Sequence, residues 1–325
     1  MWISSAPLRI SLAGGGTDLP SYAHRFGGTV LGSAIDLRVT VVGHTGSAYR
    51  GIRACLDDCA HTDIPDTQAN PFAREVLRAH WDGLPLRLAS FGDVPGGSGL
   101  GSSSAFCVAL VAGLSQQPLT AESLARAAGD IETRSLGRPV GRQDHYLAAY
   151  GGVRQLHFDR SGGVEVEGVA VDPETLRKLD DELLLFFTGT VRDAGEVLAA
   201  QHERVMGGDR DAERRLHEIK ELTTAARKAL TDGDTVALGA VLGRHWELKR
   251  GLSAGVSLPL VDRAYGDALA SGAVGGKLLG AGGGGFLLVH APAYAVGDVR
   301  AAVTAHGFTE RTFRMSAKGP DVTHL

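Results

Sequence analysis

The chain has 325 residues, of which 43% are hydrophobic and 22% are charged, and its formal net charge is -4 at pH 7. This balance gives no basic footprint for nucleic acid, and no run of Lys or Arg indicates binding to a membrane surface. The apolar runs are short, so we expect neither a membrane-spanning helix nor a signal peptide. The sequence therefore predicts a cytoplasmic protein whose partners are small molecules.

The first half of the chain mixes strands and helices. Periodicity and turn residues predict the following elements in chain order: strands near 2–12, 29–31 and 37–43, a helix at 71–80, a strand at 84–91, and helices at 103–114 and 121–136. After the break at Gly151-Gly152, strands are expected at 153–158 and 164–169.

The second half is mostly helical. An unbroken apolar run at 182–188 predicts a buried strand, and helical periodicity follows at 194–206, 212–232 and 235–251. The chain exceeds the length at which a single core stops growing, so two domains with a shared interface are expected. We place their boundary near residue 180, which gives domains 1–180 and 181–325.

The three cysteines are expected to be reduced structural thiols. Cys55 and Cys59 are separated by three residues, but no second ligand pair lies nearby to complete a zinc site. Cys107 falls in an apolar stretch. A reducing compartment fits this odd number of cysteines.

Residues 95–105 read Pro-Gly-Gly-Ser-Gly-Leu-Gly-Ser-Ser-Ser-Ala and run directly into an apolar helix. Free backbone N–H groups and the positive end of the helix dipole attract an anion, and glycine allows it to approach closely. The loop lacks the lysine of a Walker A sequence, so another nucleotide-binding fold is indicated; a flexible turn is the alternative. The predicted phosphate ligands are Pro95, Gly97, Ser98, Gly99, Leu100, Gly101, Ser102, Ser103 and Ser104.

The Gly-Leu-Gly-Ser-Ser run of this loop resembles the second motif of the GHMP small-molecule kinases, which include galactokinase, homoserine kinase and mevalonate kinase. Residues 6–20 and 275–286 resemble the first and third motifs of that family, in the right order. The resemblance implies an α+β, two-domain fold. Its N-terminal domain would be like ribosomal protein S5 and its C-terminal domain ferredoxin-like, with the active site between them and the third motif folded against the phosphate loop.

The third motif also satisfies Gly-x-Gly-x-x-Gly at 280–285, which leaves a dinucleotide-dependent oxidoreductase as a rival interpretation. A Rossmann fingerprint should follow the first strand and open a helix. Here the glycines lie late in the chain and precede a predicted strand, which argues against that interpretation.

Phosphoryl transfer needs a bound metal and a group that orients or deprotonates the attacking hydroxyl. Glu132 and Asp144 resemble the magnesium-binding glutamate and the catalytic aspartate of the family. The resemblance implies that Mg²⁺ binds Glu132 and Ser103 together with ATP, and that Asp144 accepts the substrate proton. Arg9 stands where many relatives carry lysine and would stabilise the developing charge. The alternative for Glu132 is a solvated helix carboxylate, and that for Asp144 is a loop cap. The alternative for Arg9 is a salt bridge on its strand.

The substrate-binding turn, Gly-Gly-Gly-Thr-Asp at 14–18, differs from that of galactokinases. It resembles the branch that contains D-glycero-D-manno-heptose 7-phosphate kinases and L-fucose kinases, as do residues 187–192, 246–250 and 143–146. A phosphorylated sugar needs a cationic anchor away from the reacting hydroxyl, for which Arg142, Arg192, Lys249 and Arg250 are candidates. The predicted substrate residues are Arg9, Gly15, Gly16, Thr17, Asp18, Arg142, Asp144, Arg192, Lys249 and Gly283, and Gly282 and Gly283 also face the nucleotide.

The resemblance thus implies an ATP- and Mg²⁺-dependent kinase that converts heptose 7-phosphate to heptose 1,7-bisphosphate. A 1-kinase of an unphosphorylated sugar such as L-fucose is the nearest alternative, and a non-catalytic sugar-binding protein is a remoter one. Whether the chain forms a homodimer is left open.

Overall fold

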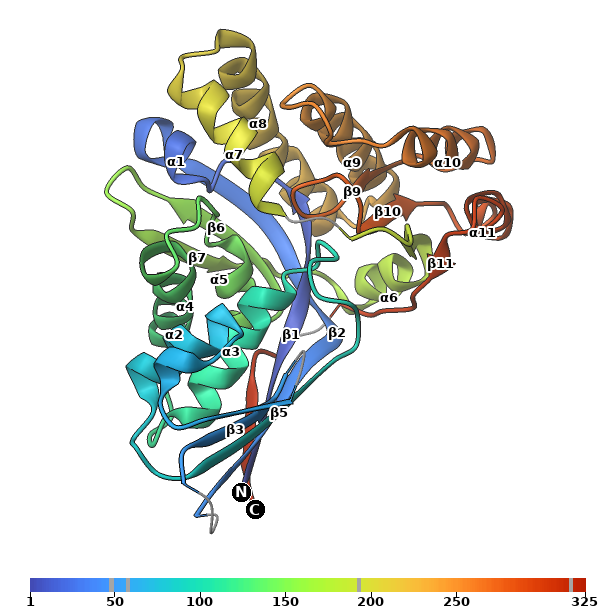
Figure 1. Cartoon of the computed structure of the whole chain (residues 1–325). Coiled ribbons are helices and arrows are strands. Elements are labelled where there is room, and N and C mark those ends of the chain that lie inside the picture. Colours follow the sequence, from blue (N-terminus) through green and yellow to red (C-terminus); the bar gives the residue numbers. More distant parts are fainter. Residues whose placement is uncertain (47–49, 57–58, 192–193, 316–317) are drawn as a thin grey trace.

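Two β-sheets organise the computed structural model, which describes residues 1–46, 50–56, 59–191, 194–315 and 318–325 (Figure 1). The larger sheet has the order β12-β1-β2-β5-β3-β4, with β6 paired to β2 and β7 paired to β6. Its strands are β1 (Trp2–Ala13), β2 (Gly28–Thr45), β3 (Ile52–Cys55), β4 (Cys59–Thr62), β5 (Leu86–Gly92), β6 (Val153–Phe158), β7 (Val164–Gly168) and β12 (Asp321–His324).

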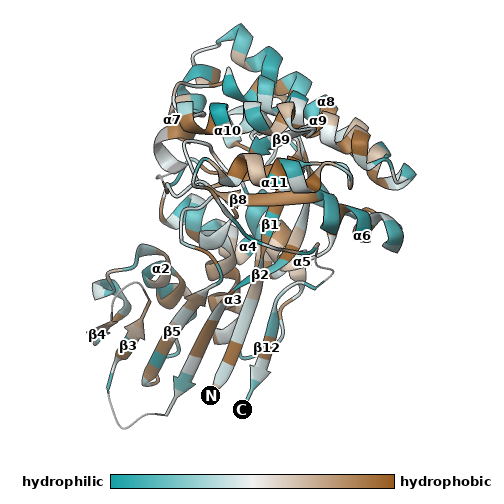
Figure 2. Ribbon diagram, turned by 90° about the vertical axis from the view of Figure 1, so that its right-hand side faces the viewer, coloured by the Kyte–Doolittle hydropathy of each residue, from teal (hydrophilic) through white to brown (hydrophobic). Residues whose placement is uncertain are grey.

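The smaller sheet has the order β11-β8-β10-β9. Its strands are β8 (Leu183–Phe187), β9 (Gly275–Leu278), β10 (Phe286–His290) and β11 (Thr309–Glu310). The sheet is buried because β8 and β10 are apolar on both faces, and Figure 2 draws β8 in brown.

The long antiparallel pair β1 and β2 carries the first sequence motif. Its register runs from Trp2 opposite Gly43 to Pro7 opposite Arg38, then shifts before Arg9 and again before Ala13. Irregularities of this kind re-aim side chains next to functional sites. The regular pairing of β1 with β2 is therefore interrupted at Arg9, whose backbone N–H donates to Leu100 O instead.

One face of the larger sheet is covered by helices from the first half of the chain. These are α2 (Pro71–His80), α3 (Ser102–Leu114), α4 (Ala121–Asp130) and α5 (Gln143–Tyr150), with a π-helical turn at Ile131–Ser135 after α4 and a 3₁₀ turn at Pro65–Thr67 before α2. Helix α3 packs against β1 and β2, and also against α4 and α5. It is apolar all round because it is enclosed on every side, as expected of a core helix.

The remaining helices are α1 (Pro20–Phe26), α6 (Pro173–Glu182), α7 (Ala194–Met206), α8 (Arg210–Asp232), α9 (Thr235–Arg250), α10 (Pro259–Ala270) and α11 (Val296–Thr304). Helix α9 packs on β9, and α8 joins α9 to β1 and β2. These contacts bring the smaller sheet against the end of β1. None of the helices in the described part of the chain combines the length and apolar character that a membrane span requires.

Most of the predicted elements are present, with two corrections. The strands predicted near 29–31 and 37–43 are one strand, β2, because the small and polar residues between them are held by backbone pairing to β1 and β6. The helix predicted at 121–136 ends at Asp130 and continues as the π turn, so Glu132 lies in the turn. The domain boundary near residue 180 stays a prediction. The late strand β12 returns to pair with β1, and in Figure 1 the two lie side by side.

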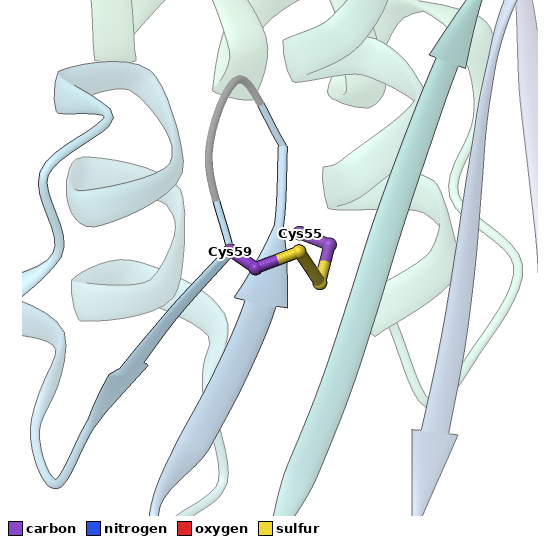
Figure 3. The surroundings of a disulfide bond; sticks show 2 residues. All are labelled: Cys55 and Cys59. Atoms are coloured by element: carbon purple, nitrogen blue, oxygen red, sulfur yellow. A yellow bond between two sulfur atoms is a disulfide. The ribbon is translucent and has the colours of Figure 1, made fainter.

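The prediction that all cysteines are reduced was wrong for two of them. The antiparallel pairing of β3 with β4 places Cys55 opposite Cys59, and the two form a disulfide (Figure 3). Spacing alone does not reveal the hairpin that sets them face to face. Cys107 is free and buried in α3, as expected.

Candidate functional site

A cavity of about 760 Å³ lies where the three glycine-rich segments meet. The first half of the chain supplies the end of β1, the loop before α3 and the first turn of α5. The second half supplies α7, α9 and the loop between β9 and β10. The predicted site residues that line the cavity are Arg9, Gly15, Gly16, Asp18, Gly97, Gly99, Gly101, Ser102, Ser103, Ser104, Glu132, Asp144, Lys249 and Gly282.

The third motif folds against the phosphate loop, as predicted. The backbone N–H of Phe286 donates to Ser98 O at 3.1 Å. A Cβ on Gly285 would lie 2.2 Å from Ser98 O, and one on Gly99 would lie 2.8 Å from Leu279 O. Only glycine allows the two backbones to approach this closely. The loop at 280–285 leads into the strand β10, so the helix that a Rossmann fingerprint requires is absent from this described segment.

The phosphate loop ends at the N-terminus of α3. Gly101 adopts a left-handed conformation with φ +77°, and the helix begins at Ser102 with no side chain capping it. The first backbone N–H groups of a helix have no partner within the helix, and here Ser102, Ser103 and Ser104 present theirs at the cavity wall. The arrangement suits an anion. Within the loop, Ser98 and Leu100 are buried, whereas Pro95 is exposed and does not line the cavity.

Arg9 and Asp144 form a two-pronged ion pair on the cavity wall. Arg9 Nε donates to Asp144 Oδ1 at 2.6 Å, and Nη2 donates to Oδ2 at 2.5 Å. Arg9 Nη1 also donates to Gly99 O at 2.7 Å, which ties the guanidinium to the phosphate loop. Asp144 lies in the first turn of α5 rather than in a loop. The predicted proximity of the cation to Asp144 is therefore observed.

Asp18 is buried beside this pair. Its carboxylate accepts hydrogen bonds from the backbone N–H of Gly16 and Gln143, both at 3.2 Å, and from Gln143 Nε2 at 2.9 Å. Burial raises the pKa of Asp18, and the charge of Asp144 raises it further. Residue 141 is a glycine because a Cβ there would lie 1.8 Å from Asp18 Oδ2.

Glu132 is buried in the cavity wall, which excludes the alternative of a solvated helix carboxylate. It accepts a hydrogen bond from Ser104 Oγ at 3.2 Å and one from Arg138 Nη1 at 3.2 Å, and His145 Nε2 lies 3.1 Å from its Oε2. Burial alone would raise the pKa of Glu132, but His145, Arg138 and Ser104 together lower it. The carboxylate is thus held ionised, and its nearest hydroxyl belongs to Ser104 rather than Ser103.

Two buried lysines line the cavity on the side of the smaller sheet, one from α9 and one from β9. Lys249 of α9 donates to Leu278 O at 3.0 Å and to Gly280 O at 2.5 Å. Lys277 of β9 lies 3.0 Å from Nδ1 of His245, which is itself buried. Burial and then the charge of Arg9 lower the pKa of Lys249 to about 7.

Other predicted substrate residues lie apart from the cavity. The Thr17 hydroxyl donates to Gly14 O and Thr29 O, so it shapes the turn. Arg142 donates to Gly162 O, and Arg250 is paired with Asp262. Gly283 donates its N–H to Val256 O, and Arg192 lies outside the described residues. Substrate roles for these residues stay predictions.

The polar residues of the cavity wall that were not predicted from the sequence include Gln143, Gln201, His245 and Lys277. Gln143 adjoins Asp144, and Lys277 falls inside the third motif, so both had a signal in the sequence. Gln201 is 6% exposed, and its Nε2 has no hydrogen-bond partner among the described residues. A buried amide of this kind is suited to a ligand hydroxyl.

A family model matches one segment in each half of the chain. Residues 70–152 match the GHMP kinases N terminal domain, and residues 226–308 match the GHMP kinases C terminal model. A D-glycero-alpha-D-manno-heptose 7-phosphate kinase of Campylobacter jejuni is 30% identical over 307 residues, or 87% of each protein. The chain belongs to the GHMP kinases.

Other relatives of this GHMP kinase have different substrates in their names. A bifunctional fucokinase/GDP-fucose pyrophosphorylase of Arabidopsis thaliana is 28% identical over 87% of this chain, which spans only 29% of that protein. A mevalonate kinase of Methanothermobacter thermautotrophicus is 26% identical over 97% of this chain and 98% of its own length. Kinases of this family are ATP-dependent and generally use Mg²⁺.

Solved structures confirm the two-domain α+β fold of this GHMP kinase. A D-glycero-D-manno-heptose 1-phosphate kinase from B. thetaiotaomicron superposes with a TM-score of 0.81 at 24% identity, covering 100% of this chain and 99% of its own. Lactococcus lactis galactokinase complexed with galactose gives a TM-score of 0.78 at 17% identity, covering 98% and 94%.

Proposed function

We propose that this GHMP kinase transfers the γ-phosphoryl group of ATP to the anomeric hydroxyl of D-glycero-D-manno-heptose 7-phosphate, giving heptose 1,7-bisphosphate. The observation that carries this proposal is the position of Asp144. Its carboxylate is fixed by Arg9, the same guanidinium touches the phosphate loop at Gly99, and Asp18 lies beside it. The proposed base Asp144, the cation Arg9, and Asp18, which can accept hydrogen bonds from sugar hydroxyls, thus line one cavity.

The chemistry follows from these groups. The α3 N-terminus and the serines there hold the phosphates of ATP. Asp144 accepts the proton of the anomeric hydroxyl as the sugar O1 attacks the γ-phosphorus. The O1–P bond forms, the bond from the γ-phosphorus to the bridging oxygen breaks, and ADP leaves with that electron pair. Arg9 contacts both oxygens of Asp144, whose remaining lone pairs are open to the hydroxyl, and stabilises the negative charge that develops.

The residues present fit a magnesium ion. Glu132 is a buried, ionised carboxylate on the cavity wall, and the hydroxyl of Ser103 lines the same wall. Proteins usually bind Mg²⁺ through one or two carboxylates, and phosphate oxygens of the substrate complete the site. The ion would neutralise phosphate charge when bound. Ser104 and Arg138 hold the Glu132 carboxylate in place in the cavity wall.

The choice of sugar rests on two features. Asp18 and the unpartnered amide of Gln201 suit hydroxyl groups of a polyol. Lys249, alone among the described candidates for a phosphate anchor, lines the cavity, which favours an anionic substrate. The heptose 7-phosphate kinase of Campylobacter jejuni supports the same choice. The fucokinase relative favours a second candidate, a 1-kinase of a neutral sugar such as L-fucose.

The test is ADP release from Mg-ATP with heptose 7-phosphate, L-fucose, D-galactose or D-mannose, followed by phosphorus NMR of the product. The proposal predicts turnover with the heptose phosphate and an anomeric phosphate signal. Turnover only with a neutral sugar would replace it by the second candidate. Absence of turnover with all four would contradict both.

A further inference from the structure

We propose that Lys277 and Lys249, together with His245, form a subsite that binds the phosphate of the sugar substrate, the one that is not transferred. The inference rests on the proposed function and deepens it, because it assigns a place for the second anionic group that a sugar phosphate carries. Lys277 and His245 lie in the cavity wall and have no part in the transfer step described above.

The first support is burial without a counter-ion. Lys277 is 2% exposed and Lys249 is 8% exposed. Their ammonium groups contact His245 Nδ1 and two backbone carbonyls, which are neutral acceptors. Buried ammonium groups are normally paired with a carboxylate. Among the described residues, no carboxylate forms a salt bridge with either lysine.

The second support is the charge balance of the cavity wall. Arg9 and Asp144 neutralise one another, and Glu132 is matched by Arg138. Asp18 accepts its hydrogen bonds from Gly16 and Gln143 and forms no salt bridge with either lysine. Any positive charge on the two lysines is therefore not paired with a carboxylate of the described residues.

Burial and neighbouring cations disfavour a positive charge on these lysines. Burial lowers the pKa of Lys277 well below its usual value, and the charges of Lys249 and Arg9 lower it further. A bound phosphate dianion reverses both effects, since it supplies opposite charge and hydrogen-bond acceptors. An ammonium group next to a bound phosphate forms short, charge-assisted hydrogen bonds.

The third support is position. The phosphates of ATP have a cradle of their own at the α3 N-terminus, on the side of the larger sheet. The lysines come from α9 and β9, on the side of the smaller sheet. His245, which contacts Lys277, reaches to Gly15: a Cβ on that glycine would lie 3.8 Å from His245 Cε1. The subsite thus adjoins the substrate-binding turn.

The test combines kinetics with inorganic phosphate as a probe. Lys277→Met keeps the length and volume of the side chain and removes its charge. We expect the KM for heptose 7-phosphate to rise about 10- to 100-fold, the range for losing a hydrogen bond to a charged group, while the KM for ATP changes less than about twofold. Inorganic phosphate should compete with the sugar phosphate in the wild type and lose this effect in the variant.

A matched control is Lys220→Met. Lys220 also donates to two backbone carbonyls, those of Phe26 and Gly27, but it lies outside the cavity. Its replacement should leave both KM values unchanged. A Lys277→Met variant with a normal KM for heptose 7-phosphate and a reduced kcat would overturn the subsite and place the lysine at the transferred group. Phosphate that competes only with ATP would also overturn it.

A binding measurement separates this inference from the proposed function. With the nucleotide side filled by a non-hydrolysable ATP analogue, inorganic phosphate should raise the thermal midpoint of the wild type and of Lys220→Met, but not of Lys277→Met. No sugar is needed for this readout. If the kinase accepts only neutral sugars, the product assay fails while phosphate binding is still measured; if phosphate does not stabilise the wild type, the subsite fails on its own.

Discussion

The ion pair between Arg9 and Asp144 links three parts of the site at the scale of single residues. The guanidinium holds both oxygens of the carboxylate and reaches Gly99, while the Arg9 backbone N–H donates to Leu100 O. A planar, permanent cation is suited to this forked contact, and a lysine would reach only one partner at a time. Arg9 thus orients the Asp144 carboxylate, which we propose as the base, and also supplies a positive charge.

Asp144→Asn should reduce kcat by a factor on the order of a hundred or more, because the amide cannot accept the substrate proton. The affinity for ATP should change little, since Asp144 does not belong to the phosphate loop. Turnover with each variant and nucleotide binding by titration would check this. Asp298→Asn is the control, because Asp298 also lies in the first turn of a helix, away from the cavity. Full turnover in Asp144→Asn would mean that another group is the base.

Lys249 should make stability depend on pH. Its pKa is about 7 in the folded protein against 10.5 for an ordinary lysine, so between these values the unfolded chain binds a proton that the folded chain does not. The free energy of unfolding should therefore rise with pH across this window. Lys277, whose pKa is also lowered, contributes in the same direction, and the ring of His245 stays neutral in this window because its pKa is lowered well below its usual value.

Urea unfolding of the wild type and of Lys249→Met across that pH window would measure the effect. The variant should show a shallower rise than the wild type. An identical slope in both proteins would show that Lys249 keeps its proton when folded.

At the scale of elements, the contact between the two glycine loops sets the shape of the phosphate site. Gly285 has φ +90°, and its missing Cβ leaves room for Ser98 O. Gly285→Ala should push the loops apart and raise the KM for ATP at least about tenfold, given the cost of strained backbone at such sites. Steady-state kinetics would test this.

The control for that substitution is Gly297→Ala. Gly297 lies in α11, and a Cβ there would meet nothing within 4 Å. Alanine at this position should leave the KM for ATP unchanged and add about 0.5–1 kcal/mol of stability, as expected in a helix. Equal effects of both substitutions would show that the loop contact does not matter for ATP.

Sequence patterns predict the long, apolar elements well and the short, polar ones poorly. The strand β12 carries no alternation because most of its residues are exposed, so only its pairing with β1 reveals it. The three glycine motifs and Asp18, Asp144 and Arg9 could be found from local sequence. Lys277 and His245 could not be paired this way, because they are 32 residues apart and meet only through the packing of α9 on β9.

At the scale of the whole molecule, the cavity draws on both sheets. Arg9, Asp144 and the phosphate loop come from the side of β1, α3 and α5, while the buried lysines come from α9 and β9. Helix α8, which packs on both β1 and α9, connects the two sides. Each half alone would lack part of the site.

Ligand binding should therefore slow amide hydrogen exchange on both sides. We expect a non-hydrolysable ATP analogue with Mg²⁺ to protect the phosphate loop and the loop between β9 and β10 together, because their backbones touch. Hydrogen exchange followed by mass spectrometry would check this, with α11 as an internal reference. Protection confined to the phosphate loop would contradict a shared site.

The contact between Asp18 and Gly141 also constrains how this protein can diverge. The carboxylate occupies the space in which any other side chain at position 141 would begin. The two positions, 123 apart in the chain, must therefore change together or not at all. Among relatives, an acid at the first and glycine at the second should be inherited as a pair. A descendant that gains a side chain at 141 has given up this placement of Asp18 in the cavity wall.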